Sequence, residues 1–308
     1  MIKIASLSTI AGALLASGLS AAPAQAGPNR TWVSGTGTDS GACTRAAPCR
    51  TFAFALTQTN AGGEIDVLDP AGYGAITITK AISIVNDGVG VAAIGASSGN
   101  AITINAGASD SVHLRGLTIE GTGGATTGIL FNSGVNLAIE NCVIQHLADG
   151  IVITPSTSSS FSVSNTIASN NSSTGINIIP FGSANVKGVL STVITNNNDT
   201  GIFVEGSVTG ASLNVTIVDS VSSNNNNVGI RLFEGTKTTV MVRNSTAANN
   251  NIGVDANGGA LYLARSTITG NQSFGVLASG GTIFSYGDND INGNVNDGIG
   301  SLTAVATH

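Results

Sequence analysis

Residues 195–206 read TNNNDTGIFVEG, and the same arrangement returns as SNNNNVGIRLFEG at 223–235 and as ANNNIGVDANGG at 248–259. In each stretch a run of Asn precedes a Gly that is followed by Ile or Val, and apolar residues then occupy alternate positions. A repeat of this length is typical of solenoids, whose coils bury their apolar faces only by stacking on one another. The Gly-Ile and Gly-Val pairs, spaced 22 to 28 residues apart, are Gly128-Ile129, Gly150-Ile151, Gly175-Ile176, Gly201-Ile202, Gly229-Ile230, Gly253-Val254, Gly275-Val276 and Gly298-Ile299.

Each pair predicts a short strand that alternates between core and surface. If the residues one and three positions after the Gly point inward, those two and four positions after it point outward. The Asn-rich segments predict sharp corners, because Asn and Gly tolerate the left-handed backbone that a corner requires. The Asn side chains at these corners are expected to stack and to hydrogen-bond from coil to coil. The spacing gives two columns of expected corner residues: Asn141, Asn165, Ser191, Asp219, Asn244, Arg265 and Asp288, and then His146, Asn170, Asn196, Asn224, Asn249, Gly270 and Gly293.

The first 26 residues have the pattern of a secretory signal peptide. Lys3 precedes a short apolar run at 10–19, and Ala24-Gln25-Ala26 is a typical cleavage site. We therefore expect a mature protein that begins at Gly27 and is secreted, either to the periplasm or to the exterior. No later stretch approaches the ~20 apolar residues that a membrane span requires.

Residues 27–60 are expected to form an N-terminal cap, and residues 61–308 the repeats. The segment 48–58, PCRTFAFALTQ, predicts a short helix with Phe52, Ala55 and Leu56 facing the core, which would cover the open end of the first coil. By contrast, the residues after Gly298 show no pattern of a second capping helix, and weak self-association is expected for this reason.

The three cysteines predict one small loop and one core residue. Cys43 and Cys49 lie six residues apart in a polar segment, so in an oxidising compartment we expect them to form a disulfide; two unpaired thiols are the alternative. Cys142 falls in an apolar run and is expected to be buried. The net charge of −6, with 9% charged residues and no basic cluster, excludes typical nucleic-acid binding.

The entry segment 31–56, TWVSGTGTDSGACTRAAPCRTFAFAL, and the Gly-Ile and Asn repeats resemble those of the pectate-lyase-like superfamily. This resemblance covers about residues 27–300. It implies an all-β fold: a single right-handed parallel β-helix with a short N-terminal capping helix. It implies no single activity, because the superfamily includes polysaccharide lyases, glycoside hydrolases, epimerases, adhesins and phage tailspikes. The lyase segment Arg-x-Pro-x-x-Arg and the hydrolase motifs Asn-Thr-Asp and Gly-His-Gly do not occur in this sequence.

Enzymes of the superfamily usually work on one long face of the helix, and three neighbouring coils put distinctive residues on such a face. The candidate catalytic residues are Glu205, Arg231 and Asp255, because two carboxylates would flank an Arg. The candidate ligand-binding residues beside them are Phe203, Phe233 and Glu234. The alternative for this group is a salt-bridge ladder on a solvent-exposed face, with the Phe rings covered by a loop.

These residues favour an exported protein that binds a polysaccharide or cell-surface glycan along one sheet face, without established catalysis. A polysaccharide lyase or glycoside hydrolase is the first alternative, and a structural or adhesive surface protein is the second. The absent motifs and short loops disfavour catalysis, whereas the exposed Phe pair disfavours an inert scaffold. No cofactor or metal is expected: DNDING at 288–293 matches the first half of a calcium loop, but its twelfth position holds Ile299 instead of Glu, which favours a coil corner.

Overall fold

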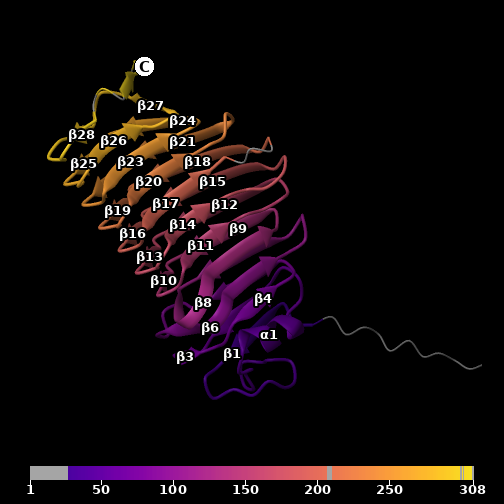
Figure 1. Cartoon of the computed structure of the whole chain (residues 1–308). Coiled ribbons are helices and arrows are strands. Elements are labelled where there is room, and N and C mark those ends of the chain that lie inside the picture. Colours follow the sequence, from indigo (N-terminus) through magenta and orange to yellow (C-terminus); the bar gives the residue numbers. More distant parts are fainter. Residues whose placement is uncertain (1–26, 207–209, 299, 301, 307–308) are drawn as a thin grey trace, which may run out of the picture.

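The structure is a computed structural model that describes residues 27–206, 210–298, 300 and 302–306, and the predicted signal peptide lies outside these residues. Figure 1 shows one continuous stack of coils, with the helix α1 at the N-terminal end and the last strands at the opposite end. The named strands pair in parallel from coil to coil. The predicted all-β, right-handed parallel β-helix is therefore confirmed.

Three sheets run along the helix. Sheet 1 consists of β1 (Arg30–Val33), β2 (Gly63–Val67), β5 (Ile82–Val85), β7 (Ser111–Arg115), β9 (Asn136–Glu140), β12 (Ser159–Ser164), β15 (Asn185–Ser191), β18 (Ser212–Val218), β21 (Thr238–Arg243), β24 (Ala260–Ala264), β27 (Thr282–Ser285) and β29 (Leu302–Ala304). Sheet 2 has the shorter strands β3 (Ala71–Gly72), β10 (Val143–Gln145), β13 (Ile167–Ser169), β16 (Ile194–Asn196), β19 (Val221–Ser223), β22 (Thr246–Ala248), β25 (Thr267–Thr269) and β28 (Asp290–Ile291). Sheet 3 has β4 (Ile76–Ile78), β11 (Asp149–Ile153), β14 (Thr174–Ile178), β17 (Thr200–Glu205), β20 (Val228–Phe233), β23 (Ile252–Asn257) and β26 (Phe274–Ala278). The long strands β6 (Ala92–Asn105) and β8 (Leu117–Ser133) continue from sheet 2 into sheet 3.

The core follows the predicted alternation in sheet 3. From Gly128 to Gly253, the residues one and three positions after each Gly of a pair are buried, among them Ile151, Ile153, Ile176, Ile178, Ile202, Val204, Ile230, Leu232, Val254 and Ala256. Since each apolar side chain stacks on its equivalents in the neighbouring coils, no coil buries its core alone.

The corners contain the left-handed residues that the Asn pattern predicts, except at three positions. Thr192 and Asn197 turn the chain, with φ of 55° each, where Ser191 and Asn196 were predicted. In the last coil Gly287, with φ of 78°, takes the left-handed conformation in place of Asp288. Turn lengths vary by one residue between coils, so counting along the chain from the Gly does not fix the corner.

The hydrogen-bonded Asn ladder lies one residue after the left-handed corner residues of the second column. From Asn198 onward, each Oδ1 accepts hydrogen bonds from the backbone N–H and the Nδ2 of the equivalent Asn in the preceding coil, at 2.8–3.2 Å. The Oδ1 of Asn171, the first member, accepts from the Leu147 N–H at 3.2 Å. The corner residue must adopt the left-handed backbone and remains exposed, which directs the side chain of the next residue into the interior. The ladder consists of Asn171, Asn198, Asn225, Asn250, Asn271 and Asn294.

The N-terminal segment closes the first coil. Helix α1 (Phe52–Gln58) buries Phe52, Ala55 and Leu56, as predicted. It begins at Phe52 rather than at Pro48, because the Thr51 side chain caps it and accepts a hydrogen bond from the Phe54 N–H. With seven residues, this helix cannot cross a bilayer, and the described residues contain no helix that could.

The three cysteines are arranged around this segment and the core. Cys43 and Cys49 are joined by a disulfide. Cys142 is buried, and burial raises the pKa of its thiol to about 11. A thiol that stays protonated is a poor nucleophile, so Cys142 is a packing residue.

Candidate functional site

The six candidate residues come together on the outer face of sheet 3. The alternation that buries Ile202 and Val204 turns the side chains of Phe203 and Glu205 outward, and β20 and β23 repeat this arrangement. The strand register places Phe203, Arg231 and Asp255 in one row across β17, β20 and β23. A second row contains Glu205, Phe233 and Asn257, and Glu234 follows directly after β20.

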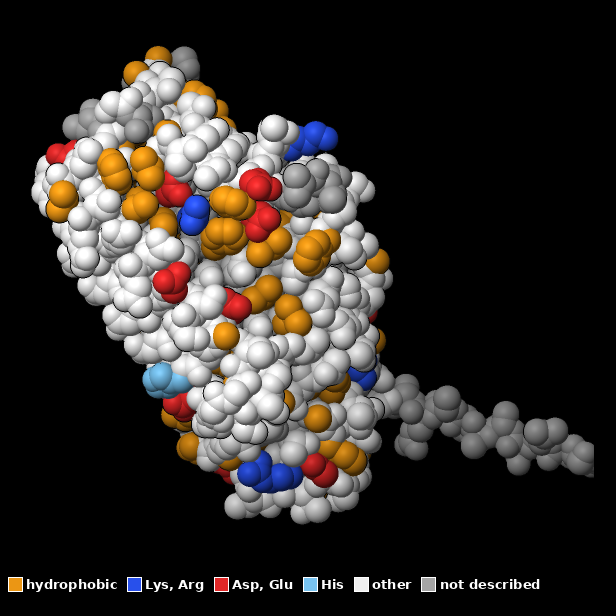
Figure 2. Space-filling view, viewed as in Figure 1, with side chains coloured by type: hydrophobic (Ala, Val, Ile, Leu, Met, Phe, Trp, Pro, Cys, Tyr) orange, Lys and Arg blue, Asp and Glu red, His pale blue; other side chains and the backbone are white. Residues whose placement is uncertain are grey.

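Phe203, Phe233 and Arg231 lie next to one another on this face, and we call these three side chains the aromatic platform. The two ring centroids are 6.0 Å apart with 29° between the ring planes, and Arg231 Cζ lies 5.2 Å from the Phe233 centroid. Both rings are half-buried, so part of each faces solvent. Figure 2 shows hydrophobic, acidic and basic side chains gathered together over this part of the helix.

Asp255 lies beneath this surface rather than on it. It is only 3% exposed, its Oδ1 accepts a 2.8 Å hydrogen bond from Ser279 Oγ, and its Oδ2 lies 3.2 Å from Arg231 Nε. The Arg231 contact lacks the alignment of a hydrogen bond, since this buried Nε has no hydrogen-bond partner, so we regard it as a charge pair. The prediction of an exposed Asp255 carboxylate is wrong, because the Arg231 and Ser279 side chains cover it.

Glu205 and Glu234, both partly exposed, supply negative charge near the platform. Burial, and to a lesser degree the neighbouring Glu234, raises the pKa of the Glu205 carboxyl above its ordinary value. Glu234 occupies a left-handed turn with φ of 53°, and its backbone N–H donates a 2.7 Å hydrogen bond to the Asn257 carbonyl.

We predict that Glu205→Gln raises the free energy of unfolding at neutral pH by a small amount. A carboxyl whose pKa is raised on folding is destabilising when it is ionised, and this penalty disappears as the pH falls through its folded pKa. Urea denaturation of both proteins should therefore give the variant the higher free energy of unfolding at pH 7. At pH 4 the two free energies should be nearly equal. An equal difference at the two pH values would contradict this assignment.

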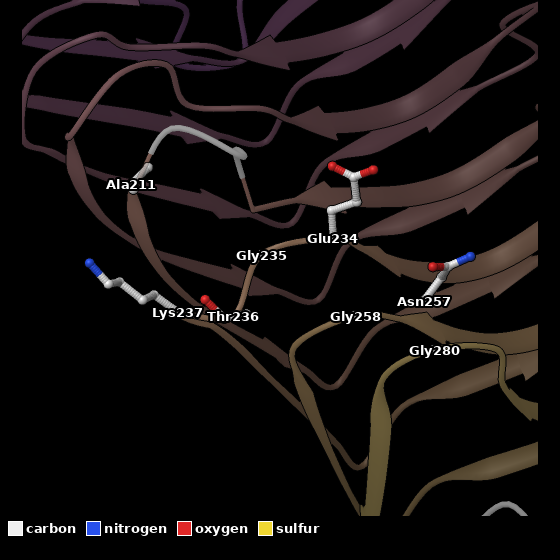
Figure 3. A pocket seen from close by; sticks show the side chains of 9 residues that line it. Ala211, Glu234, Gly235, Thr236, Lys237, Asn257, Gly258 and Gly280 are labelled. Carbon is white, nitrogen blue, oxygen red and sulfur yellow. The ribbon is translucent and has the colours of Figure 1, made fainter.

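A cavity of about 400 Å³ opens beside the platform, between the turns that follow β20, β23 and β26. Figure 3 shows Glu234 and Asn257 on one side of it and Lys237 on the other, with Gly235 and Gly258 between them. A Cβ at Gly258, where φ is 119°, would lie 2.7 Å from Glu234 Cα, so the turns can approach each other only with glycine there. Sequence reasoning missed Lys237 and Asn257; the glycines at 235, 258 and 280 are the signal that could have indicated an open space.

His146 and the segment 288–293, which could have indicated catalysis or metal binding, have structural roles in the coils. His146 is a left-handed corner residue whose Nδ1 lies 3.1 Å from Glu120 Oε1. In the segment that resembles a calcium loop, Asp288 Oδ1 and Asn289 Oδ1 accept hydrogen bonds from backbone N–H groups of the preceding coil. Among the residues described, no three His, Cys, Asp or Glu side chains are grouped so that they could hold a metal ion.

Comparison of the whole structure with solved structures identifies the fold. The crystal structure of pectate lyase Pel9A matches 92% of this chain and 78% of its own, with a TM-score of 0.53 and 17% identity. The A-module of the Azotobacter vinelandii mannuronan C-5 epimerase AlgE6 matches 80% of this chain and 88% of its own, with a TM-score of 0.51 and 14% identity. This chain has the pectate-lyase-like β-helix fold.

Sequence comparisons add less. A family described as a domain of unknown function, DUF4957, matches residues 64–200 of this β-helix protein, which is less than half of the chain. No curated protein matches this chain. Because the DUF4957 match ends before Phe203, the candidate site lies in coils that the family model does not cover.

Proposed function

We propose that this β-helix protein is exported and binds a polysaccharide through the aromatic platform, without turning it over. The observation that carries the proposal is the pair of partly exposed Phe rings in line with Arg231. Sugar rings present apolar C–H faces that stack on aromatic rings, while their hydroxyls take hydrogen bonds from a planar guanidinium. Within the described residues the Nη groups of Arg231 have no hydrogen-bond partner, so they are available to a ligand.

The geometry favours binding over catalysis. Asp255 is engaged by Arg231 and Ser279 under the surface, where it has no access to a glycosidic bond. Glu205 lies two strands away from Asp255, with β20 between them. A lyase or hydrolase needs its acid and base to reach the same bond.

The charges indicate which polymer binds best. Asp255 already compensates the charge of Arg231, and the two carboxylates Glu205 and Glu234 outnumber the one further cation, Lys237, which lies across the cavity. The names of the two structural neighbours specify pectate and mannuronan, which are acidic polymers. At this platform we expect neutral polysaccharides to bind more tightly than acidic ones, because like charges repel.

Affinity electrophoresis in gels that contain neutral or acidic polysaccharides tests the proposal. We expect at least one neutral polymer to retard the protein, and Phe203→Ala/Phe233→Ala to weaken this binding about tenfold or more, since each lost stacking contact contributes about 0.5–1.5 kcal/mol. Phe181→Ala is the matched control, because Phe181 is 56% exposed and lies outside the platform. Equal losses in the control and the double variant would contradict the proposal.

The same samples separate the alternatives. We expect neither unsaturated products nor new reducing ends; turnover that disappears in Arg231→Ala would instead establish the lyase or hydrolase. Retardation by no polymer would overturn the proposal and favour a structural or adhesive protein.

A further inference from the structure

A second concave site lies at the N-terminal end of sheet 1, far along the chain from the platform. It is a cavity of about 220 Å³ whose lining includes Trp32 of β1, Arg45, and the apolar side chain of Val89. Trp32 is partly exposed, and Val89 is 41% exposed. An aromatic ring and an aliphatic side chain beside a ring-sized cavity suit a ligand with an apolar face.

Three arginines in and around this cavity, Arg30, Arg45 and Arg115, balance three acids, Glu64, Asp66 and Asp87, but Arg45 has no acidic partner in the described part of the chain. The guanidinium of Arg30 donates two hydrogen bonds to the Asp66 carboxylate, from Nε and from Nη2, the latter at 3.1 Å. The carboxylate of Asp87, a second acid in the lining, pairs with Arg115 at 2.9 Å. Arg45 has no ion pair or hydrogen bond among the residues described and is exposed, so its charge is free to bind an anion.

The disulfide loop holds Arg45 next to the ring. The Trp32 N–H donates to the Cys43 carbonyl at 2.8 Å, and the Cys49 N–H donates to the Trp32 carbonyl at 2.9 Å. Between the two cysteines, Thr44 and Ala47 close a turn with a 3.1 Å hydrogen bond, and Arg45 lies inside it. Both ends of the disulfide loop are thus attached to the backbone of Trp32. The guanidinium of Arg30 lies 5.9 Å from the centroid of the Trp32 ring.

We propose that Trp32 and Arg45 form a binding site for a carboxylate carried on a ring with an apolar face, such as a uronic-acid residue. The ring packs on Trp32 and Val89, and the carboxylate accepts two parallel hydrogen bonds from the Arg45 guanidinium. The site differs from the platform because each acid in its lining already has a basic partner, whereas Arg45 has no acidic partner within the described residues.

Tryptophan fluorescence tests this proposal selectively, because Trp32 is the one Trp of the chain. The protein is titrated at low ionic strength with glucuronate, glucose and benzoate. Glucuronate should change the emission saturably, and glucose should bind at least about tenfold more weakly. Arg45→Gln should weaken glucuronate binding about tenfold or more, whereas Arg243→Gln, an exposed residue of sheet 1, should leave it unchanged.

The comparison of ligands and variants distinguishes the possible results of this titration. Benzoate that binds as tightly as glucuronate, with the same dependence on Arg45, supports a general site for ring carboxylates; weaker benzoate binding supports a sugar acid. Phe203→Ala/Phe233→Ala should not alter the signal, so this result is independent of the platform. The absence of a saturable change with glucuronate, or an equal change in Arg45→Gln, would overturn the proposal.

Discussion

Asn225→Leu should lower the free energy of unfolding by about 3–4 kcal/mol, because it breaks the buried ladder in its middle. Asn225 is 2% exposed; its Oδ1 accepts from the N–H and Nδ2 of Asn198, and its Nδ2 donates to Asn250 Oδ1 and to the Thr195 carbonyl. Leucine has a similar volume but leaves these partners buried without hydrogen bonds, and each such group costs about 1–3 kcal/mol.

The control for this prediction is the next residue. Asn226 is exposed, and Asn226→Leu should change stability by no more than about 0.5 kcal/mol. Urea denaturation followed by circular dichroism gives both values. If the two variants had similar midpoints, the buried ladder would not contribute as we infer, and the Asn runs would need another explanation.

Gly229→Ala should destabilise the protein by about 1–3 kcal/mol, although alanine is the better residue in an ordinary strand. A Cβ at Gly229 would lie 2.6 Å from the Gly253 carbonyl oxygen and 2.7 Å from Asn250 Nδ2, so the next coil would have to move away. Equivalent contacts at Gly175 and Gly253 explain why a glycine opens each repeat.

Gly95→Ala is the matched test of the opposite sign. A Cβ there meets nothing within 4 Å, and the backbone is not left-handed. We expect this variant to gain up to about 0.5–1 kcal/mol, since glycine in a strand costs conformational entropy. Thermal and urea denaturation should rank Gly95→Ala above the wild type and Gly229→Ala below it; the reverse order would show that coil spacing does not require the glycine.

The fold could be predicted from the sequence because the same residue pattern recurs from coil to coil. The Gly-Ile pairs carry both the spacing of the coils and the inward direction of residues such as Ile202 and Ile230. The same alternation correctly placed Phe203, Arg231 and Asp255 in one row of sheet 3. These features depend on contacts between equivalent positions, which periodicity reveals.

The incorrect predictions concern local features that a repeating pattern does not determine. The ladder residues Asn198 and Asn225 lie two positions and one position after the predicted Asn196 and Asn224, because side-chain direction at a corner depends on the left-handed residue before it. The burial of Asp255 depends on a Ser and an Arg from neighbouring coils that happen to cover it. Lys237 and Asn257 were missed because the cavity is formed by turns, whose lengths differ from coil to coil.

The most direct test of the platform is hydrogen–deuterium exchange with and without the neutral oligosaccharide that gives the strongest electrophoretic retardation. The proposal predicts slower exchange in peptides covering 200–206, 228–234 and 252–257, and no change in the equivalent strands at 149–153 and 174–178. Protection confined to another face, or bound sugar with no protection on β17, β20 and β23, would contradict it.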